Sequence, residues 1–311
     1  MRLEIVLLYE NDQGKALCEV ASRVLTSVSV SFDHSFVIST RYTCAHEVED
    51  SVLDKCLEAD AVLAASDAMT SLPSLAMELN CRARVRELRY DHLVENRSLM
   101  GADKPLRAVV VQALESDRES LDAAVQTGYA LAEHEELPLH TVPPAGTLAG
   151  VWQEVLKTAQ GKKHRHDWSL PEVLPSVIRD PAYAGVILCP PYAGMVIAPA
   201  VTALCGAPAM GYDWYTGGET PLFAPLSMEE SFRHDDANPF GMLRAVHALL
   251  RDVFNMEMEA GCVEGAMRNV LQAGWRSADI ASPGLPQLDA DGIVNLLCQQ
   301  IDVAGEWMKN Q

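Results

Sequence analysis

Short runs of apolar, β-favouring residues alternate with longer segments of helical periodicity along nearly the whole chain. Runs rich in Val, Ile and Leu are typical of strands covered on both faces. They predict strands at Leu3–Leu8, Val28–Val37, Ala61–Ala65, Leu106–Leu114, Leu139–Val142 and Gly185–Cys189. The segments between them predict helices at about Lys15–Leu25, Ser116–Glu135, Gly146–Gln160, Glu172–Arg179 and Gly194–Leu204. This alternation indicates an α/β protein with a largely parallel sheet.

The last third of the chain changes character after Cys205. Gly206 follows the apolar segment there, and glycine is the usual residue just past a helix end. The stretch Ala207–Asp236 is rich in Gly, Pro and aromatic residues and is predicted to be loop. Helices resume at Asn238-Pro239, an N-cap residue followed by proline. Two further amphipathic helices are predicted at Cys262–Ala273 and Ile293–Met308.

The composition excludes several classes of protein. The chain has 311 residues, of which 49% are hydrophobic, so it is globular rather than disordered. Its formal net charge of −19 repels phosphate backbones and anionic lipid, so neither nucleic acid nor membrane is expected as a partner. The apolar N-terminal run contains Glu4 and no small-residue cleavage site, which predicts a cytoplasmic protein. Eight scattered cysteines without a C-x-x-C pair favour reduced thiols.

Several short motifs follow one another in an order typical of one enzyme family. They are Glu58–Leu63, Glu87-Leu88-Arg89, Gly185–Gly194, Leu222–Leu226, Ala237-Asn238-Pro239 and Gly274–Ile280, with a Trp-bearing helix at Trp152–Lys157. In this order they resemble motifs of the β-decarboxylating dehydrogenases, the isocitrate and isopropylmalate dehydrogenase family. The resemblance covers nearly the whole chain.

The resemblance implies a doubly wound α/β fold with two domains. A large domain would combine residues 1–89 and 206–311, and a smaller central domain would span 90–205. The family is usually an obligate dimer, and we expect a homodimer here. The helix at Gly194–Leu204 is apolar all round and therefore needs cover on every side, which a dimer interface would supply.

The resemblance does not carry over the family's metal chemistry. The family holds a divalent metal with aspartates at i and i+4 of one helix, and the matching residues here are Met195 and Pro199. A third aspartate falls near Pro171, beside Glu172, and the acid–base lysine matches Pro144. None of the directly matching residues ligates a hard metal ion or transfers a proton.

The substrate and cofactor residues are also mostly replaced. Arg89 matches one substrate arginine, whereas Leu79 and Gln112 stand where the family has two others. The T-G-G-I-Y-F-G loop has no counterpart after Leu114. The dinucleotide motif H-G-S-A-P-D is replaced by Ser227–Phe232, which contains two acids. We therefore expect no cofactor, with NAD as the alternative.

These replacements favour a catalytically degenerate protein, a pseudoenzyme that serves in small-molecule binding, regulation or assembly. The alternative is a divergent NAD(P)-linked oxidoreductase, or a metal-free enzyme, acting on a small hydroxy acid. A small carboxylate metabolite is the expected ligand, bound near the carboxyl ends of the strands. The residues expected to line that cleft are Arg89, Gln112, Tyr192 and Asn238, with Asn11 and Gly14 at its rim. Cys189 ends a strand at the same edge and is interpreted as a buried thiol rather than a nucleophile.

Overall fold

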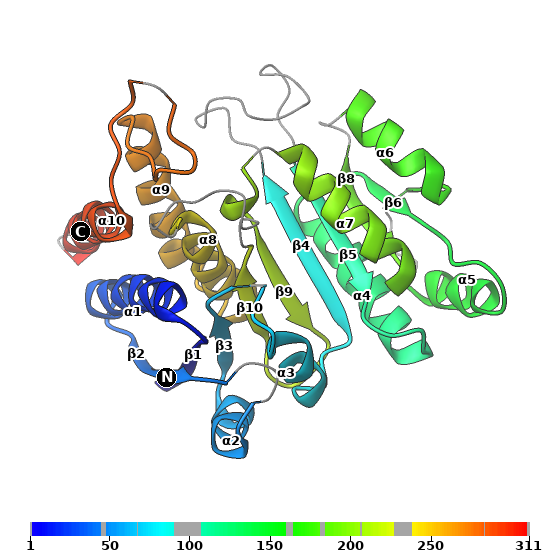
Figure 1. Cartoon of the computed structure of the whole chain (residues 1–311), viewed down its shortest axis with the longest axis horizontal. Coiled ribbons are helices and arrows are strands. Elements are labelled where there is room, and N and C mark those ends of the chain that lie inside the picture. The colour runs from blue at the N-terminus through cyan, green and yellow to red at the C-terminus, as the bar shows by residue number, and fades with distance from the viewer. Residues whose placement is uncertain are drawn as a thin grey trace.

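A mixed ten-stranded sheet forms the middle layer of the molecule (Figure 1). The computed structural model describes residues 2–44, 48–66, 68–89, 107–159, 164–180, 184–205, 207–226, 238–282 and 284–309. The strands are β1 (Arg2–Tyr9), β2 (Ser35–Tyr42), β3 (Ala61–Ala64), β4 (Ala83–Arg89), β5 (Arg107–Ala113), β6 (Leu139–Thr141), β7 (Arg165–Asp167), β8 (Gly185–Cys189), β9 (Tyr212–Thr216) and β10 (Leu222–Pro225).

Helices cover both faces of this sheet, as expected for a doubly wound α/β fold. They are α1 (Asp12–Phe32), α2 (Asp50–Glu58), α3 (Leu72–Glu78), α4 (Arg118–His134), α5 (Leu148–Thr158), α6 (Leu170–Arg179), α7 (Pro191–Cys205), α8 (Phe240–Ala248), α9 (Glu257–Gln272) and α10 (Ala290–Lys309). A short 3-10 turn, η2 (Pro208–Met210), precedes β9, and a π-helical turn, η3 (Leu249–Val253), follows α8.

The strand order is β2-β1-β3-β10-β9-β4-β5-β8-β6-β7. Two parallel groups, β2-β1-β3-β10 and β5-β8-β6-β7, flank the central strands β9 and β4, which are antiparallel to their neighbours. The two groups run in opposite directions, so their carboxyl ends lie at opposite edges of the sheet. The sequence predicted a largely parallel sheet, which agrees with these two groups but not with the antiparallel centre.

Three apolar clusters hold the helices to the sheet. The largest packs α1, α8, α9 and α10 against β1, β3 and β10. The second places α6 and α7 on one face of β5 and β8, and the third places α4 and α5 on the opposite face. The predicted division at residues 89/90 falls between β4 and β5, but the sheet runs through it without a break. The division into two domains therefore stays a prediction.

The predicted strand at Val28–Val37 is wrong in its first half. Helix α1 continues to Phe32, and Val28 is fully buried on its inner face. Asp33 adopts a left-handed conformation (φ 57°) that ends the helix, and β2 begins at Ser35. Burial of the helix face outweighs the β propensity of this Val-rich run.

The predicted loop after Gly206 is also wrong in part, because β9 and β10 lie within it. Residues 227–237 lie outside the described residues. Strand β4 was not predicted either. The helix predicted at Gly194–Leu204 begins three residues earlier, at Pro191, and ends at Cys205 as expected. Of the helices in the described part of the chain, none has the length and apolar character needed to cross a bilayer.

Candidate functional site

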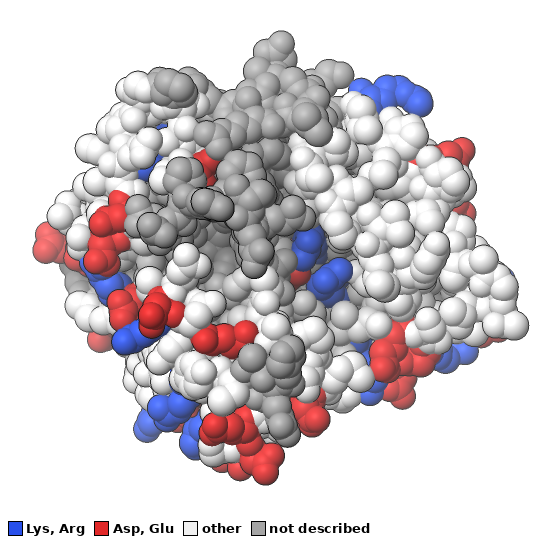
Figure 2. Space-filling model, viewed as in Figure 1, with Lys and Arg blue, Asp and Glu red and all other residues white. Residues whose placement is uncertain are grey.

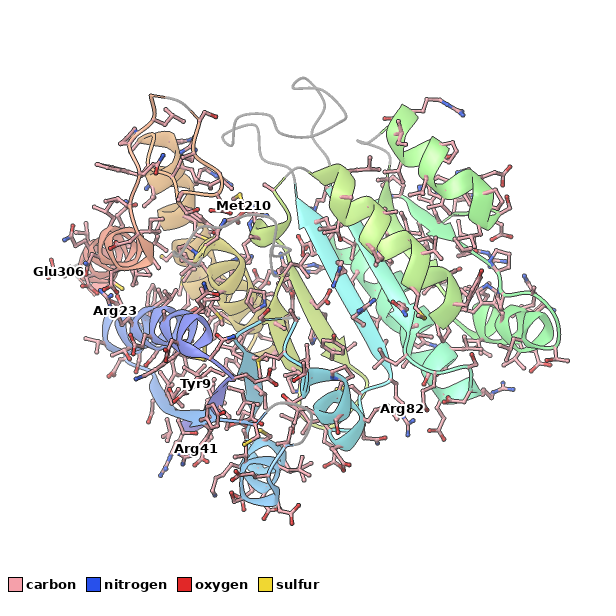
Figure 3. The ribbon with its side chains drawn as sticks, in the orientation of Figure 1. Tyr9, Arg23, Arg41, Arg82, Met210 and Glu306 are labelled. Carbon is pink, nitrogen blue, oxygen red and sulfur yellow. The ribbon has the colours of Figure 1, made fainter. Side chains whose placement is uncertain are left out.

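A cluster of polar side chains lies at the centre of the sheet, on the face that α7 covers. Alternate residues of a strand point to opposite faces. Arg84 and Arg86 of β4 contact residues of β5, β9 and α7, whereas Val85 belongs to the cluster under α4 and α5. Figure 2 shows basic side chains in a hollow near the middle of this view of the molecule. Arg82, labelled in Figure 3 just before β4, is paired with surface acids instead.

Arg86 and Asp213 form a buried ion pair between β4 and β9. Arg86 donates from Nε to Asp213 Oδ1 at 2.7 Å and from Nη2 to Oδ2 at 2.6 Å. Asp213 has no exposed surface, and Thr202 of α7 accepts a third bond from Arg86 Nη1 at 3.3 Å. The planar guanidinium fits a carboxylate in this bidentate geometry. The carboxylate of Asp213 therefore occupies the bidentate binding position of Arg86, the most buried arginine in the cluster.

Arg84 and Gln112 continue the cluster towards the start of α7. Arg84 Nη2 donates to Gln112 Oε1 at 2.5 Å, and Gln112 Nε2 donates to the carbonyl oxygen of Pro191 at 3.1 Å. Gly194 makes this arrangement possible, because a Cβ at that position would lie 2.3 Å from Gln112 Cδ. The Arg84 side chain keeps 21% of its surface exposed and lies 3.9 Å from Asp213. It is therefore the arginine of this cluster that solvent reaches more readily.

The residues predicted to line one cleft lie in different places. Gln112 is 6% exposed in the cluster, and Tyr192 is 73% exposed on the first turn of α7 nearby. Asn11 and Gly14 follow β1, whose carboxyl end lies at the opposite edge of the sheet from that of β5. The side chain of Arg89 lies outside the described residues. Of the five predicted residues whose side chains the structure describes, it thus brings together two, Gln112 and Tyr192.

Asn11 and Gly14 build the start of α1. The Asn11 side chain caps the helix by accepting a bond from the Gly14 backbone N–H at 2.8 Å. A Cβ on Gly14 would come within 3.0 Å of Ala65 Cβ, so the turn packs closely against the end of β3. Glu10 beside it accepts bonds from the Ser71 backbone N–H at 2.9 Å and hydroxyl at 2.6 Å. These contacts describe a structural turn.

The side chain of Asn238 also forms hydrogen bonds within the protein. Its Oδ1 accepts from the Phe240 backbone N–H at 2.8 Å at the start of α8, and its Nδ2 donates to Asp279 Oδ2 at 2.7 Å. Helix α8 begins at Phe240 with Pro239 as its N-cap residue, one residue later than predicted, so Asn238 lies just before the N-cap. The acids Glu229 and Glu230, expected where a dinucleotide would lie, fall outside the described residues.

The residues that the family resemblance places around a metal ion do not fit a divalent cation. Met195 is 69% exposed on α7, and Pro199 lies on the same exposed side of that helix. A thioether and a proline ring supply no hard oxygen donor. Glu172 instead accepts bonds from the backbone N–H and the hydroxyl of Ser169 at the start of α6. In the described part of the chain, three or more His, Cys, Asp or Glu side chains nowhere gather as metal ligands.

Cys189 is a buried thiol, as expected. It has no exposed surface, and its Sγ contacts the Val111 carbonyl oxygen at 3.6 Å. Burial raises the pKa of this thiol to about 12, so it stays protonated at neutral pH.

Sequence reasoning missed Arg84, Arg86 and Asp213 as members of a site. The signal was present in Arg82-Ala83-Arg84-Val85-Arg86, where arginines alternate with small apolar residues at the period of a strand. Asp213 carries no such local signal, because the strand that pairs it with Arg86 lies 127 residues further along the chain.

Sequence comparisons find similarity to 3-isopropylmalate dehydrogenases. The chain is 34% identical over 86 residues to a 3-isopropylmalate dehydrogenase from Oleidesulfovibrio alaskensis, a match that spans 27% of this chain and 24% of that protein. It is 24% identical to the 3-isopropylmalate dehydrogenase of Priestia megaterium over 96% of this chain and 95% of that protein. No model of a known protein family matches the chain.

Solved structures share the fold over almost the whole chain. Isocitrate dehydrogenase from Methylococcus capsulatus superposes with a TM-score of 0.80 at 14% identity, covering 97% of this chain and all of that one. A β-decarboxylating dehydrogenase from Thermococcus kodakarensis, in its apo form, gives a TM-score of 0.76 at 16% identity, with 97% of each chain covered. The fold expected from the sequence is therefore confirmed.

Proposed function

We propose, on the premise that this chain is a relative of the isopropylmalate dehydrogenases and has their fold, that it is a catalytically degenerate form. Its role would be to bind a small carboxylate ligand in regulation or assembly, rather than to oxidise a hydroxy acid. Fold alone does not decide between these roles, since activity depends on the residues of the site.

The observation that carries this proposal is the pair Arg86–Asp213. A buried arginine fork that could hold a substrate carboxylate is filled by an acid of the protein itself, at 2.7 and 2.6 Å. On the neighbouring helix, Met195 and Pro199 offer no hard donor for a metal that would polarise a hydroxyl group. Substrate positioning and metal binding are thus both impaired in one region.

Arg84 and Gln112 are the side chains that we propose for ligand binding. Arg84 supplies a charge and solvent exposure, and Gln112 supplies an amide held in place by the Pro191 carbonyl oxygen. A carboxylate approaching Arg84 would replace the Gln112 amide oxygen as its acceptor, with a charge-assisted bond in place of a neutral one. Tyr192 lies on the same helix turn that Gln112 contacts.

A thermal-shift screen tests the proposal with the purified full chain. The ligands are NAD⁺, NADP⁺, Mg²⁺, Mn²⁺ and a set of di- and tricarboxylic acids, because a ligand of the native state raises the melting temperature. We expect a shift from at least one acid and none from the nucleotides or metals. The Arg84→Leu variant should lose that shift, and Arg41→Leu, an exposed arginine on β2, should keep it.

An activity assay separates the two candidate functions. We expect no reduction of NAD⁺ or NADP⁺ with isocitrate, isopropylmalate, malate or tartrate, with or without Mg²⁺ or Mn²⁺. A nucleotide shift together with turnover above a no-enzyme control would favour the NAD(P)-linked oxidoreductase instead. A shift from no acid at all would contradict the carboxylate-binding role.

We also propose that the chain forms a homodimer through α7. Tyr192, Met195 and Val196 expose 73%, 69% and 43% of their surface on one side of this helix. Within one chain α7 is therefore buried on one side only, whereas its sequence is apolar all round. The cysteines with described side chains are free thiols, which is in keeping with a cytoplasmic protein.

A further inference from the structure

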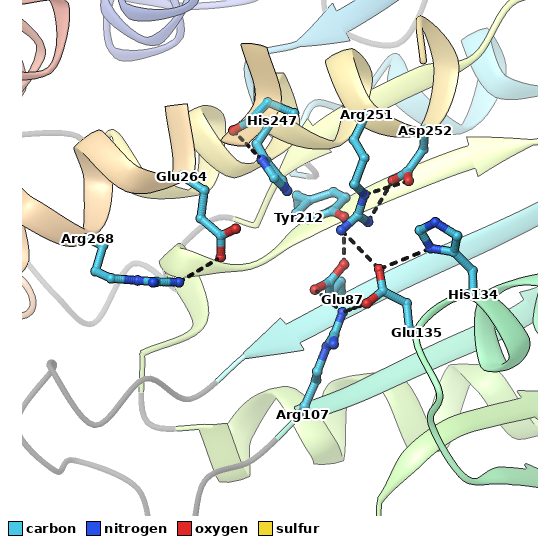
Figure 4. A network of polar contacts seen from close by, with 11 residues as sticks. Glu87, Arg107, His134, Glu135, Tyr212, His247, Arg251, Asp252, Glu264 and Arg268 are labelled. Carbon is cyan, nitrogen blue, oxygen red and sulfur yellow. Dashed lines mark hydrogen bonds and ion pairs between the residues drawn. The ribbon is translucent and has the colours of Figure 1, made fainter. Parts of the chain in front are cut away.

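A second polar network surrounds Glu87 of β4 (Figure 4). It lies on the opposite face of the sheet from Arg84, because alternate residues of a strand point to opposite faces. Glu87 of β4 accepts a bond from the Tyr212 hydroxyl at 2.7 Å and lies 3.8 Å from Arg107. Burial, followed by the charge of Glu87, raises the pKa of Tyr212 well above its ordinary value, so its hydroxyl keeps the proton that it donates. On the strand side of this network, Glu87 and Tyr212 are thus engaged with each other within the protein.

Arg251 joins the network from the π-helical turn η3. Asp252 accepts from Arg251 Nε at 2.7 Å and from Nη2 at 2.9 Å, and Glu135 lies 2.9 Å from Nη1. The guanidinium is therefore held in one orientation before any ligand arrives. π-Helical turns inside α-helical segments are frequent at functional sites, and this one directly follows α8.

A cavity of about 40 Å³ lies between these strands and the helices α8 and α9. Its charged lining residues are Arg244, His247, Arg251, Arg268, Glu87 and Glu264. Arginines outnumber acids in this lining, although the whole chain has 43 acidic residues against 24 lysines and arginines. The local balance of charge is thus opposite to that of the protein.

Two lining residues retain capacity for a ligand. His247 donates its Nδ1 proton to the Ala260 carbonyl oxygen at 2.9 Å, which leaves Nε2 for another contact. Arg268 lies 3.6 Å from Glu264, beyond a normal hydrogen bond, and its side chain is 55% exposed. In Figure 4 His247 and Glu264 project from the helices towards the strands that carry Glu87 and Tyr212.

We propose that this cavity binds a small inorganic oxyanion of the phosphate type. Arg268 would supply charge-assisted bonds, while Arg244 and Arg251 would add positive charge to the lining. The volume corresponds to about three water molecules, which suits one tetrahedral anion and excludes a nucleotide. The site is separate from the proposed carboxylate cluster, because β4 presents Glu87 and Arg86 on opposite faces.

Calorimetric titration of the full chain with sodium phosphate tests the proposal, with sodium chloride at matched ionic strength as the reference. We expect saturable binding of phosphate, similar binding of sulfate, and none of acetate. The Arg268→Gln variant should weaken phosphate at least fivefold, since a hydrogen bond to a charged group is removed. Arg244→Gln should weaken it as well.

The matched control is Arg118→Gln, which removes the same charge from an exposed ion pair with Glu154. It should leave the phosphate affinity unchanged. Arg268 is exposed, so its variant is expected to fold, and circular dichroism verifies this. Heat from phosphate no larger than that from chloride would overturn the proposal, as would wild-type affinity in both cavity variants. Loss of phosphate binding in Arg84→Leu alone would assign the anion to the other face.

Discussion

Arg86 and Asp213 hold the two antiparallel strands at the centre of the sheet together through a bidentate contact in which both side chains are buried. Their strands, β4 and β9, separate the two parallel groups. A charge buried in this way is stabilising only while its partner is present.

Replacing Arg86 alone should therefore be costly. We expect Arg86→Met to lower the free energy of unfolding by about 3–5 kcal/mol, because Asp213 is left charged and unpaired in the interior. Urea denaturation followed by circular dichroism measures the change. The double variant Arg86→Met/Asp213→Leu should recover most of the loss. A single variant as stable as the wild type would show that the pair does not hold the strands.

Gly194 and Gly265 both lie in helices, but alanine should act oppositely at the two. At Gly194 the added methyl group would displace Gln112, and we expect a loss of about 1–3 kcal/mol. At Gly265 of α9 an added Cβ would meet no atom within 4 Å outside its own stretch of helix, so alanine should stabilise the helix by about 0.5–1 kcal/mol. Thermal unfolding of the two variants is the measurement, and a change of the same sign in both would refute the explanation.

Glu135 should make stability depend on pH in the acid range. Burial alone would raise its pKa, but the hydrogen bond and charge of Arg107, with the charges of Arg251 and His134, outweigh it and hold the pKa below the ordinary value of 4.5. The unfolded chain therefore takes up this proton first as the pH falls. The stabilisation is complete above pH 4.5 and is lost as the pH falls through the lower folded value.

The test compares wild type with Glu135→Gln from pH 7 to pH 3. At pH 7 we expect the variant to be about 1.5–3 kcal/mol less stable, and the difference should shrink towards pH 3. Glu154→Gln, in an exposed pair with Arg118, is the control and should cost at most about 1 kcal/mol. A difference for Glu135→Gln that grows with acid would have the wrong sign.

The exposed side of α7 should mediate dimer formation. Met195→Glu places a charge at its centre, and we expect light scattering to show a particle of 33.9 kDa for the variant and of twice that mass for the wild type. Met258→Glu is the control, since Met258 is 64% exposed on α9. A wild-type particle that stays at the monomer mass at micromolar concentration would contradict the proposed homodimer.

The sequence predicted best where neighbouring residues decide the structure. The strands at β1, β3, β5, β6 and β8 agree with the prediction to within a residue at each end, because their runs are short and lie next to polar residues or proline. The end of α7 at Cys205 also agrees. The run near Val28 misled the prediction, since the same valines suit a buried helix face.

The candidate site was less accessible to sequence reasoning than the fold. The buried position of Arg86 depends on Asp213 and Thr202, which reach it from distant parts of the chain. The family resemblance instead predicted Arg89 as the substrate-binding arginine. Gln112 lies in the polar cluster through a contact with Arg84 that follows only from the pairing of β4 with β5, and its role in ligand binding stays a prediction.

The position of β10 has a consequence for the order of events during synthesis. Leu222 and Phe223 of β10 pair with Val62 and Leu63 of β3. Strand β3 therefore gains this neighbour only after some 160 further residues have been synthesised. The last helix, α10, then covers α1, where Asp302 accepts a bond from Ser27 at 2.7 Å. A nascent chain on the ribosome thus lacks the second neighbour of β3 until β10 is made, and it lacks the helix that covers α1 until α10 is made. A chain truncated before α10 would expose the apolar surface of α1 that this helix covers to chaperones and proteases.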